Sequence, residues 1–547
     1  MTFSLSPAVI VQEIDLTNVI PAVSTSTAST VGQFKWGPVE EITIVSNEEI
    51  LVELFGRPSR TVYKDFLTAS SFLSYARDLR LIRVVDDATA LNAAYPSDSN
   101  NTSELIKNLQ EYSAMSFGSD INLFYAKYPG VLGNSIGVAW VNATGWADVD
   151  SNGVQNWPWS DLFESAPLTD EMHIVVYDAD GVITGNAGTV LERWAFVSTV
   201  AGTKSFDGTT AYFKDKISNG SKYLYVANET LMSGSNDGVA LIAGNDGSVI
   251  SEGDRTRGFA LLQNSEVTDV SLVFASGAGV IASKWIIDNV AEYRKDCVAL
   301  VSPLQSDCVG IYSDQTILNN IKVTRDTYGS SSYAVMDSAY KYTYDRYNDA
   351  YRWIPLNGDI AGVIARTDAN YASWYSPAGY EKGRIKNSIK LSMDQNKQVR
   401  DDLYKAGINP CTAFPVEGAL LFGDKTLLSR PSAFAHINVR RLFITLEKAI
   451  ATASKYYLFD QNNTQTRTRF VNMVEPFLRE VQGREGITDF RVVCDESNNP
   501  GDVIDRGEFV AAIYIKPTRS IQTIRLSFVA VRTGVDFDEV IINSSQA

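Results

Sequence analysis

Cysteine and histidine are scarce in this chain of 547 residues, which has four cysteines and two histidines. Cys297, Cys308, Cys411 and Cys494 lack the close spacing of a metal-binding or redox motif. We therefore expect reduced, buried thiols in a protein made in a cytoplasm. The scarcity of histidine also removes the commonest general base of nucleophilic catalysis from most of the chain.

Positive charge and long apolar runs are also in short supply. Lysine and arginine total 48 against 64 acidic residues, giving a net charge of −16 and a pI near 4.8. This balance repels phosphate groups and anionic membranes, so we expect no nucleic-acid partner. No apolar run approaches the roughly 20 residues that span a bilayer, so we expect no membrane insertion. The N-terminus has no basic region before Lys35, and we expect no signal peptide.

Candidate catalytic groups are few and poorly placed. His173 falls within a predicted strand and His436 just before a predicted helix, and neither lies near a serine or cysteine motif. A packed or capping histidine is the favoured interpretation of each. The acid pairs Asp86–Asp87 and Asp401–Asp402 are more typical of solvated surfaces than of glycosidase carboxylates. The sequence therefore predicts no enzyme and no bound cofactor.

One glycine-rich turn has the form of a nucleotide-binding motif. Gly277, Gly279 and Ala282 follow a predicted strand and open a predicted helix, where glycine would let a pyrophosphate approach the helix N-terminus. A single match of this kind is weak, and close packing is the favoured interpretation. Nucleotide binding stays open as the enzymatic alternative.

A second motif has the spacing of the first half of a calcium-binding EF-hand loop. Its residues are Asp148, Asp150, Asn152 and Gly153. The twelfth position is Trp159 where a bidentate glutamate is needed, and Pro158 opposes an exiting helix. An exposed Asn-Gly turn is the favoured interpretation, so we expect no metal here.

The N-terminal third alternates between strand, helix and loop signals. Residues 8–17 alternate in the manner of a strand, whereas Val23–Thr30 is small and polar and is predicted to be a flexible tether. Helices are predicted over 48–55 and 62–75, and a core strand over 79–85.

The middle of the chain is expected to form a separate domain. A boundary is placed near Asn92, where a polar loop ends, and the sequence up to about Ala243 is rich in Gly, Asn, Asp and Thr. Short apolar strands such as 172–178 and 222–228 interrupt this composition. We therefore expect a mainly β inserted domain.

A regular alternation of helix and strand follows. Helices over 255–262 and 280–295 alternate with strands over 269–275 and 296–302, an order that predicts a parallel α/β sheet. Long helices are predicted over 385–406, with Gly407 as its stop, and over 439–457. The chain closes with predicted strands at 509–515 and 520–531.

Four basic residues on the second of these long helices stand out in an acidic chain: Arg440, Arg441, Lys448 and Lys455. Ion pairs with nearby acids such as Glu447 would explain them. A docking face for an acidic partner would explain them equally well.

Several stretches together resemble the tail sheath proteins of contractile bacteriophage tails, nearest to the T-even type. The resemblance rests on LYKAGINPCTAFPVEGALLFGDKTL at 403–427, INVRRLFITLEKAI at 437–450 and ARTDANYASWYSPAG at 365–379. Other matches are LSPAVIVQE, FKWGPVE, LFGRP, YPGVLGNSI, YKYTYDRYNDAYRWIPLNGDIAG, FRVVCD and VIDRGEFVA. The resemblance is strong over 6–92 and 255–535 and weak between, where the chain is shorter than the T-even proteins.

The resemblance implies a multidomain α/β and α+β fold with a non-catalytic sheath core of subtilisin-like shape. The expected divisions are an N-terminal arm at 1–22, a core at 23–92 plus 246–427, an outward-facing inserted domain at 93–245, and a C-terminal domain with an arm at 428–547. The implied function is a virion tail sheath, assembled in the host bacterial cytoplasm as stacked hexameric rings around a tail tube, with baseplate and terminator proteins at its ends. Contraction would drive the tube through the host envelope, and the four basic residues would face the tube.

Both chain ends are expected to pair with neighbouring subunits, since a strand on a tether can add to an exposed sheet edge. The N-terminal arm and a C-terminal arm near 536–542 would pair with a hairpin at 509–531. The candidate pairing residues are Ile10, Gln12, Ile14, Leu16, Ile513, Ile524, Leu526 and Phe528. The alternative is a surface-binding or receptor-binding module of a virion, which would form a closed oligomer or a monomer.

Overall fold

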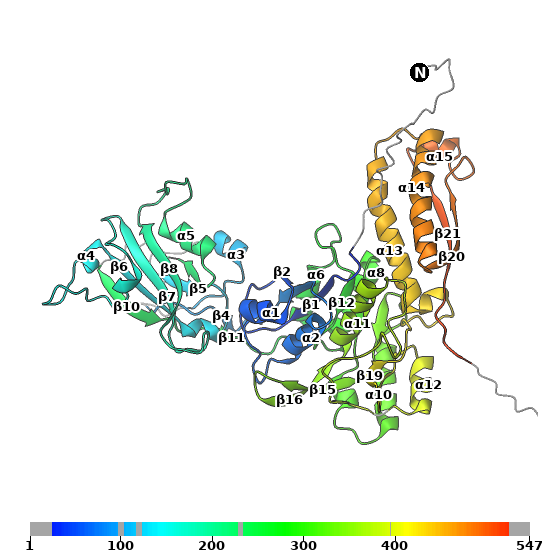
Figure 1. Cartoon of the computed structure of the whole chain (residues 1–547), viewed down its shortest axis with the longest axis horizontal. Coiled ribbons are helices and arrows are strands. Elements are labelled where there is room, and N and C mark those ends of the chain that lie inside the picture. Colours follow the sequence, from blue (N-terminus) through cyan, green and yellow to red (C-terminus); the bar gives the residue numbers. More distant parts are fainter. Residues whose placement is uncertain (1–23, 97–102, 116–122, 228–233, 394, 525–547) are drawn as a thin grey trace, which may run out of the picture.

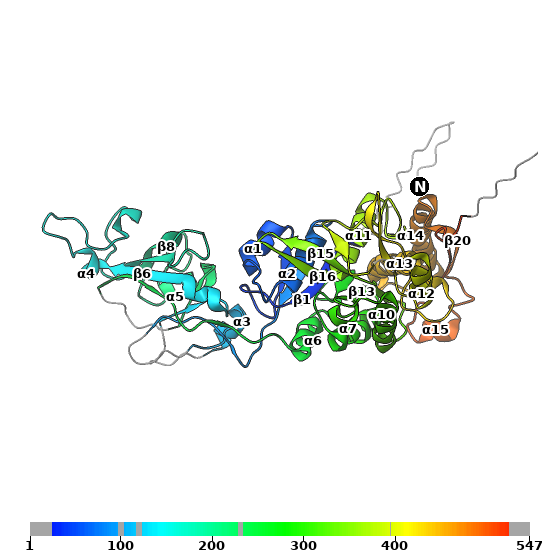
Figure 2. The same ribbon diagram turned by 90° about the horizontal axis from the view of Figure 1, so that it is seen from below.

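The computed structural model describes residues 24–96, 103–115, 123–227, 234–393 and 395–524. The chain is elongated, with a β-rich module at one end, an α/β core in the middle, and long helices of a C-terminal module at the other end (Figures 1 and 2). Three main hydrophobic clusters match this arrangement, one in each part. A fold of mixed helix and strand in several parts is as the sequence predicts.

A six-stranded sheet forms the centre of the core. Its order is β14 (Ala334–Met336), β13 (Val298–Val301), β12 (Leu272–Phe274), β1 (Ala28–Gly32), β3 (Leu79–Arg83) and β2 (Ile42–Val45). All neighbouring strands are parallel except β2, which runs antiparallel to β3. The predicted parallel α/β sheet is confirmed.

Helices cover both faces of this sheet (Figure 2). One layer contains α6 (Glu252–Ala260), α7 (Val280–Ile286) and α10 (Asp314–Tyr328), and the other contains α2 (Lys64–Leu73) and α11 (Asn357–Asn370). The shorter helices are α1 (Glu48–Phe55), α3 (Leu109–Ala114), α4 (Ala143–Trp146), α8 (Glu292–Arg294) and α9 (Gln305–Cys308), with a π-helix at Ile287–Ala291. Single 3-10 turns lie at Val131–Ser135, Ser160–Leu162, Ala433–Ala435 and Lys455–Tyr457.

The prediction of a flexible tether over Val23–Thr30 is wrong from Ala28 onward. Strand β1 is buried at every position and lies between β12 and β3. Its small side chains allow helices to approach closely: a Cβ on Gly32 would lie 2.5 Å from the Cβ of Asp65. The hydroxyls are satisfied by backbone carbonyls, with Ser29 donating to Arg80 and Thr30 to Phe274 at 2.9 Å each.

The inserted module is built around a four-stranded antiparallel sheet in the order β10 (Ser235–Ala240), β6 (Ile136–Asn142), β7 (Glu171–Asp178) and β8 (Thr189–Ser198). A second pair joins β5 (Phe124–Ala126) to β9 (Leu224–Val226), with α5 (Phe213–Gly220) beside it. The predicted strand at 172–178 is therefore present as β7, and the one at 222–228 is present over 224–226 as β9, with residue 228 outside the described part of the chain.

Two chain crossings connect this module to the core. Strand β4 (Ala90–Leu91) pairs with β11 (Asn245–Asp246). Beside them, the buried guanidinium of Arg83 donates to the carbonyl oxygens of Phe34, Gly37 and Pro129 at 2.6–2.9 Å. Burial lowers the pKa of Arg83 to about 9, although Asp246 opposes the shift.

A small sheet extends the core, with the order β16 (Ala350–Pro355), β15 (Tyr340–Asp345) and β17 (Lys390–Leu391), next to a hairpin of β18 (Cys411–Phe414) and β19 (Gly418–Leu421). The prediction of one helix over 385–406 is wrong in its first half. The Ile385 amide donates to the carbonyl of Ala419, and Ile389 donates to Tyr342, so this segment is an extended edge. Helix α12 covers only Lys397–Lys405.

The end of α12 agrees with its sequence signal. Gly407 has φ +78°, its amide donates to Tyr404, and the Ile408 amide donates to Leu403. This pair of hydrogen bonds is the Schellman arrangement that a glycine after a helix favours.

The C-terminal module packs α13 (Ile437–Ser454) and α14 (Thr464–Gly483) against a two-stranded antiparallel sheet of β20 (Ile487–Val493) and β21 (Ala512–Pro517). A short helix, α15 (Gly501–Asp505), lies in the connection between the strands. The predicted hairpin of 509–515 with 520–531 is wrong for the described residues, because β21 pairs with β20 and residues 520–524 lie in no strand. Residues 525–531 lie outside the described part of the chain.

The four cysteines are buried and unpaired, as predicted. Burial raises the pKa of the Cys297 and Cys308 thiols to about 12 each. These thiols are therefore protonated and unreactive at neutral pH.

Candidate assembly surface

The last described segment of the chain is fixed to the core by one buried carboxylate, Asp424. Its Oδ2 accepts hydrogen bonds from Ser520 Oγ at 2.8 Å and Ser376 Oγ at 3.1 Å. Its Oδ1 accepts from Gln522 Nε2 at 3.0 Å and Tyr404 OH at 3.1 Å. We call Ser520–Gln522 the C-terminal root.

His436 completes this cluster from the N-cap position of α13, with its Nδ1 3.2 Å from Asp424 Oδ1. Asp424 is 3% exposed. Burial opposes ionisation, but the hydrogen bonds from His436, Ser520 and Gln522 outweigh it and lower the pKa of Asp424 to about 2. The carboxylate is therefore ionised and holds the root throughout the neutral range.

The N-terminal segment is held close to the same helix. The carbonyl oxygen of Thr25 accepts from Arg441 Nη2 at 2.7 Å, and that of Ser24 accepts from Ser271 Oγ at 2.8 Å. Thr27 Oγ1 donates to Asp78 at 2.6 Å. We call Ser24–Thr27 the N-terminal root. Arg441 lies on α13 only five residues after His436, so α13 contacts the attachment of both roots.

Three of the four predicted tube-contact residues have partners inside the chain. Arg441 is buried and paired with Asp368, and Arg440 lies 4.2 Å from the ring centroid of Tyr333 and 4.0 Å from that of Phe434. Lys448 pairs with Asp269. Local ion pairing thus accounts for Arg441 and Lys448, through acids other than Glu447. Lys455 alone of the four is exposed.

The predicted strand-pairing residues are only partly within the described chain. Ile513 lies on β21 and is half-buried, and Ile524 is 75% exposed. Ile10, Gln12, Ile14, Leu16, Leu526 and Phe528 lie outside the described residues. In the described part of the chain, β20 and β21 have no further partner strand, so each leaves one edge unpaired.

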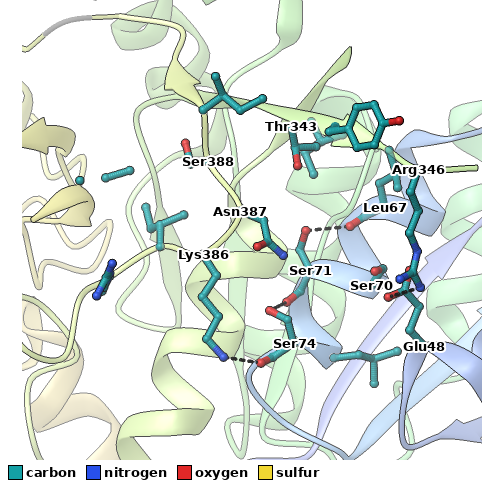
Figure 3. Close-up of a pocket in the computed structure, with 18 of the residues that line it drawn as sticks. Glu48, Leu67, Ser70, Ser71, Ser74, Thr343, Arg346, Lys386, Asn387 and Ser388 are labelled. Atoms are coloured by element: carbon teal, nitrogen blue, oxygen red, sulfur yellow. Dashed lines mark hydrogen bonds and ion pairs between the residues drawn. The ribbon is translucent and has the colours of Figure 1, made fainter. Parts of the chain in front are cut away.

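A groove of about 900 Å³ lies between α2, β15, the extended 384–389 segment and the turn before β19. Figure 3 shows Lys386 reaching across to α2, where its Nζ donates to the carbonyl of Ser74 at 2.6 Å. On the opposite side, Arg346 pairs with Glu48 at 3.0 Å. The lining includes the cations Arg346, Arg366, Arg384 and Lys386 and the acids Glu48 and Glu417. The groove is therefore positive in an acidic chain.

The glycine-rich turn is occupied by the protein itself. The Glu252 carboxylate accepts from the amides of Gly279 and Ala282 at 2.9 Å each, at the start of α7. Gly277 donates to Asp65, which is also paired with Arg255. The position that a phosphate would take at the helix N-terminus is thus filled by a carboxylate.

Local contacts also explain the EF-hand-like segment and His173. Asp150 accepts from the amides of Asn152 and Val154 within one turn. His173 is buried, stacks on Phe163 with centroids 4.1 Å apart, and has Nε2 3.0 Å from the Ser165 carbonyl oxygen. In the described residues, no acidic, histidine or cysteine cluster could hold a metal ion. No described helix has both the length and the apolar character needed to cross a membrane.

Sequence reasoning missed the Asp424 cluster. Its members come from loops, α12, the start of α13 and the C-terminal root, and Ser376 and Gln522 are 146 positions apart. No local spacing could have connected them.

Comparison with known proteins assigns the chain to a family. Sequence models of the phage tail sheath protein central domain and the phage tail sheath C-terminal domain match residues 282–427 and 429–530. The tail sheath protein of Vibrio phage KVP40 is 33% identical, with 98% of this chain and 99% of the relative covered. That of Enterobacteria phage T4 is 31% identical, with the same coverage.

Solved structures share the fold. A sheath tail protein from Listeria innocua superimposes with a TM-score of 0.55 at 13% identity, covering 91% of this chain and 96% of the other. The contracted helical sheath of the anti-feeding prophage gives 0.54 at 12% identity, covering 96% and 99%. The chain therefore belongs to the tail sheath protein family and is a structural protein of a phage tail, not an enzyme.

Proposed function

We propose that this protein polymerises as hexameric rings stacked around a tail tube, between a baseplate and a terminator protein. Contraction of this sheath then drives the tube through the host envelope for genome delivery. Assembly takes place in the host bacterial cytoplasm. The observation that carries the proposal is that both described chain ends are fixed near α13, beside a two-stranded sheet with open edges.

The open edges of β20 and β21 are the acceptors in this proposal. A lone two-stranded sheet is marginal in stability, and added strands would satisfy its remaining N–H and C=O groups. The sequence at 8–16 alternates as a strand should, and the segment at 536–542 is the second candidate. Each would add as a strand to the C-terminal sheet of a neighbouring subunit, where Ile513 of β21 would be one of the pairing residues.

Such contacts join different surfaces of identical chains, so repetition gives an open helical lattice. Strand pairs persist while the segments between root and strand change direction. The globular bodies can therefore pass between two packings without losing their neighbours. The free energy of contraction would be the difference between these packings, summed over the subunits.

Lys455 is the remaining candidate for a contact with the tube. It lies in the 3-10 turn that ends α13 and is exposed, whereas Arg440, Arg441 and Lys448 are engaged within the chain. An acidic tube surface would be attracted to it.

Deletion of residues 1–20 tests the proposal. The variant should fold, as judged by circular dichroism and an unchanged unfolding midpoint, but remain monomeric where the full chain forms hollow striated tubes in negative-stain electron microscopy. Normal tubes from the deleted chain would contradict strand exchange through this arm.

A further inference from the structure

The groove beside α2 carries positive charge that the chain does not neutralise. Arg366 Nη2 donates to the carbonyl oxygens of Lys382 and Arg384, and Lys386 Nζ donates to that of Ser74. Carbonyl oxygens satisfy the N–H donors but leave the full charge in place. Among the described residues, Arg366, Arg384 and Lys386 form no ion pair.

Three buried cations elsewhere in the core are neutralised by acids. Arg255 pairs with Asp65, Lys341 with Asp359, and Arg441 with Asp368. Each charge thus has a carboxylate beside it, as burial demands. The groove cations Arg384 and Lys386, by contrast, are exposed and have no carboxylate partner among the described residues, in a chain whose acids outnumber its bases by 64 to 48.

Aromatic rings hold these cations in place of acids. Arg366 and Lys386 both lie over the ring of Tyr75, at 5.1 and 4.8 Å from its centroid. On either side of this extended segment, Lys382 lies over the ring of Tyr371 and Lys390 over that of Tyr342, at 4.8 and 5.0 Å from the centroids. Cation–π contacts orient a charge without cancelling it. These ring contacts therefore fix the positions of the cations while leaving their charge available to a partner.

An acidic loop without ion pairs to other described residues lies elsewhere on the chain, although Asp495 accepts hydrogen bonds from Ser497. Between β20 and β21, the loop 495–505 carries Asp495, Glu496, Asp502 and Asp505, all exposed. None forms an ion pair with another described residue. The loop ends in α15, on the C-terminal module, whereas the groove lies beside β15 in the core (Figures 1 and 2).

We propose that the groove is an interaction surface between copies of this chain, and that its occupant is the acidic loop 495–505 of a second copy. Two chains that each carry a net charge of −16 repel one another, so a docking site needs local charge of opposite sign. The groove supplies the cations and the loop supplies the acids. This inference rests on the proposed function and adds to it a contact that uses neither arm.

The groove and the loop are different surfaces, so their contact is heterologous and propagates along a lattice, as the arm contacts do. Unlike strand pairing, it is made by exposed charges and is weakened by salt. The contact therefore sets the salt dependence of assembly and can be broken while the arms stay joined.

A charge-swap experiment on the full-length chain tests the inference. The variant Arg384→Glu/Lys386→Glu should raise the protein concentration needed for tube formation at low salt by about tenfold or more, corresponding to about 1.4 kcal/mol. Asp502→Lys/Asp505→Lys should do the same. Combining all four substitutions should restore assembly, because the attraction returns with its signs exchanged.

The matched control is Arg57→Glu/Arg60→Glu, which changes the net charge equally at two exposed cations outside the groove. It should form tubes near the wild-type concentration. Equal tube formation by the groove variant and wild type would overturn the inference. The inference would also be overturned if the groove variant kept the wild-type unfolding midpoint, lost tube formation, and did not regain it when Asp502→Lys/Asp505→Lys was added.

The experiment that would contradict the proposed function is different from the one that would overturn the groove contact. Deletion of residues 1–20 tests the arm and leaves both the groove and the loop intact. Normal tubes from that deletion would contradict arm exchange, while restoration by the charge swap would still support the groove contact.

Discussion

Ser520 donates a hydrogen bond to Asp424 across 96 positions of the sequence, at 2.8 Å from Oγ to Oδ2. Through this contact, the C-terminal root is attached at a point next to the first turn of α13. The tertiary structure of the core therefore fixes the position at which the described chain ends.

Replacement of Asp424 by asparagine should loosen this root. The neutral amide cannot accept all of the hydrogen bonds that converge on the carboxylate, and buried donors left unpaired cost about 1–3 kcal/mol each. We expect the free energy of unfolding to fall by roughly 2–3 kcal/mol, with faster tryptic cleavage near Arg519. Denaturant unfolding and limited proteolysis measure both effects.

Asp401→Asn on α12 is the matched control, because Asp401 is exposed and lines the same pocket as Asp424 and Ser520. It should change the free energy of unfolding by less than about 0.5 kcal/mol. Equal cleavage rates for Asp424→Asn and wild type would show that the carboxylate does not hold the root.

The contribution of Asp424 should depend on pH in a defined direction. Its folded-state pKa, about 2, lies below the unfolded value of about 3.9. The stabilisation is therefore fully present above about pH 4 and is lost as the pH falls toward 2. The difference in unfolding midpoint between wild type and Asp424→Asn should therefore shrink as the pH falls from about 4 toward 2. A difference that grows on acidification would contradict this assignment.

Asp337 should show the opposite behaviour. Burial raises its pKa to about 8, although a hydrogen bond from Ser302 opposes the shift. Because the folded state binds this proton more tightly than the unfolded chain does, its contribution to stability declines as the pH rises from about 4 through 8. Asp337→Asn should therefore lose less stability than wild type between pH 6 and 9, as measured by thermal unfolding. An identical pH profile in the two proteins would argue against a protonated Asp337.

Glycine substitutions should separate close packing from helix propensity. Gly32→Ala places a methyl group 2.5 Å from the Asp65 Cβ and should cost about 1–3 kcal/mol through overpacking of β1 against α2. Gly483→Ala, at the end of α14, meets no atom within 4 Å and should be neutral or stabilising by up to about 1 kcal/mol. Urea denaturation of both variants tests the pair, and a neutral Gly32→Ala would contradict the close approach.

Sequence reasoning succeeded where a structural signal is local. The stop at Gly407 follows from the residue itself, and the helix over 439–457 follows from its apolar stripe; it is observed as α13 with one further turn. The alternation of helices and strands after Asp254 likewise predicted the parallel sheet.

Sequence reasoning failed where tertiary packing determines the local structure. Strand β1 consists of small residues because helices approach it closely on a buried sheet, and from sequence alone such a stretch has the composition of a linker. The segment 385–392 has enough helix-forming residues to suggest a helix, but it forms edge hydrogen bonds with β15 and β19. The Asp424 cluster and the cationic groove join distant positions and required the fold.

The attachment of both roots beside α13 has a mechanical consequence. In the proposed sheath, a pull on one arm would pass through Thr25 and Arg441, or through Ser520 and Asp424, into α13 and out through the other arm. Tension along a chain of subunits would therefore bypass the β-rich inserted module, which is joined to the core at the far end of the molecule (Figure 1). That module is free to change in size and surface without altering the path along which force travels.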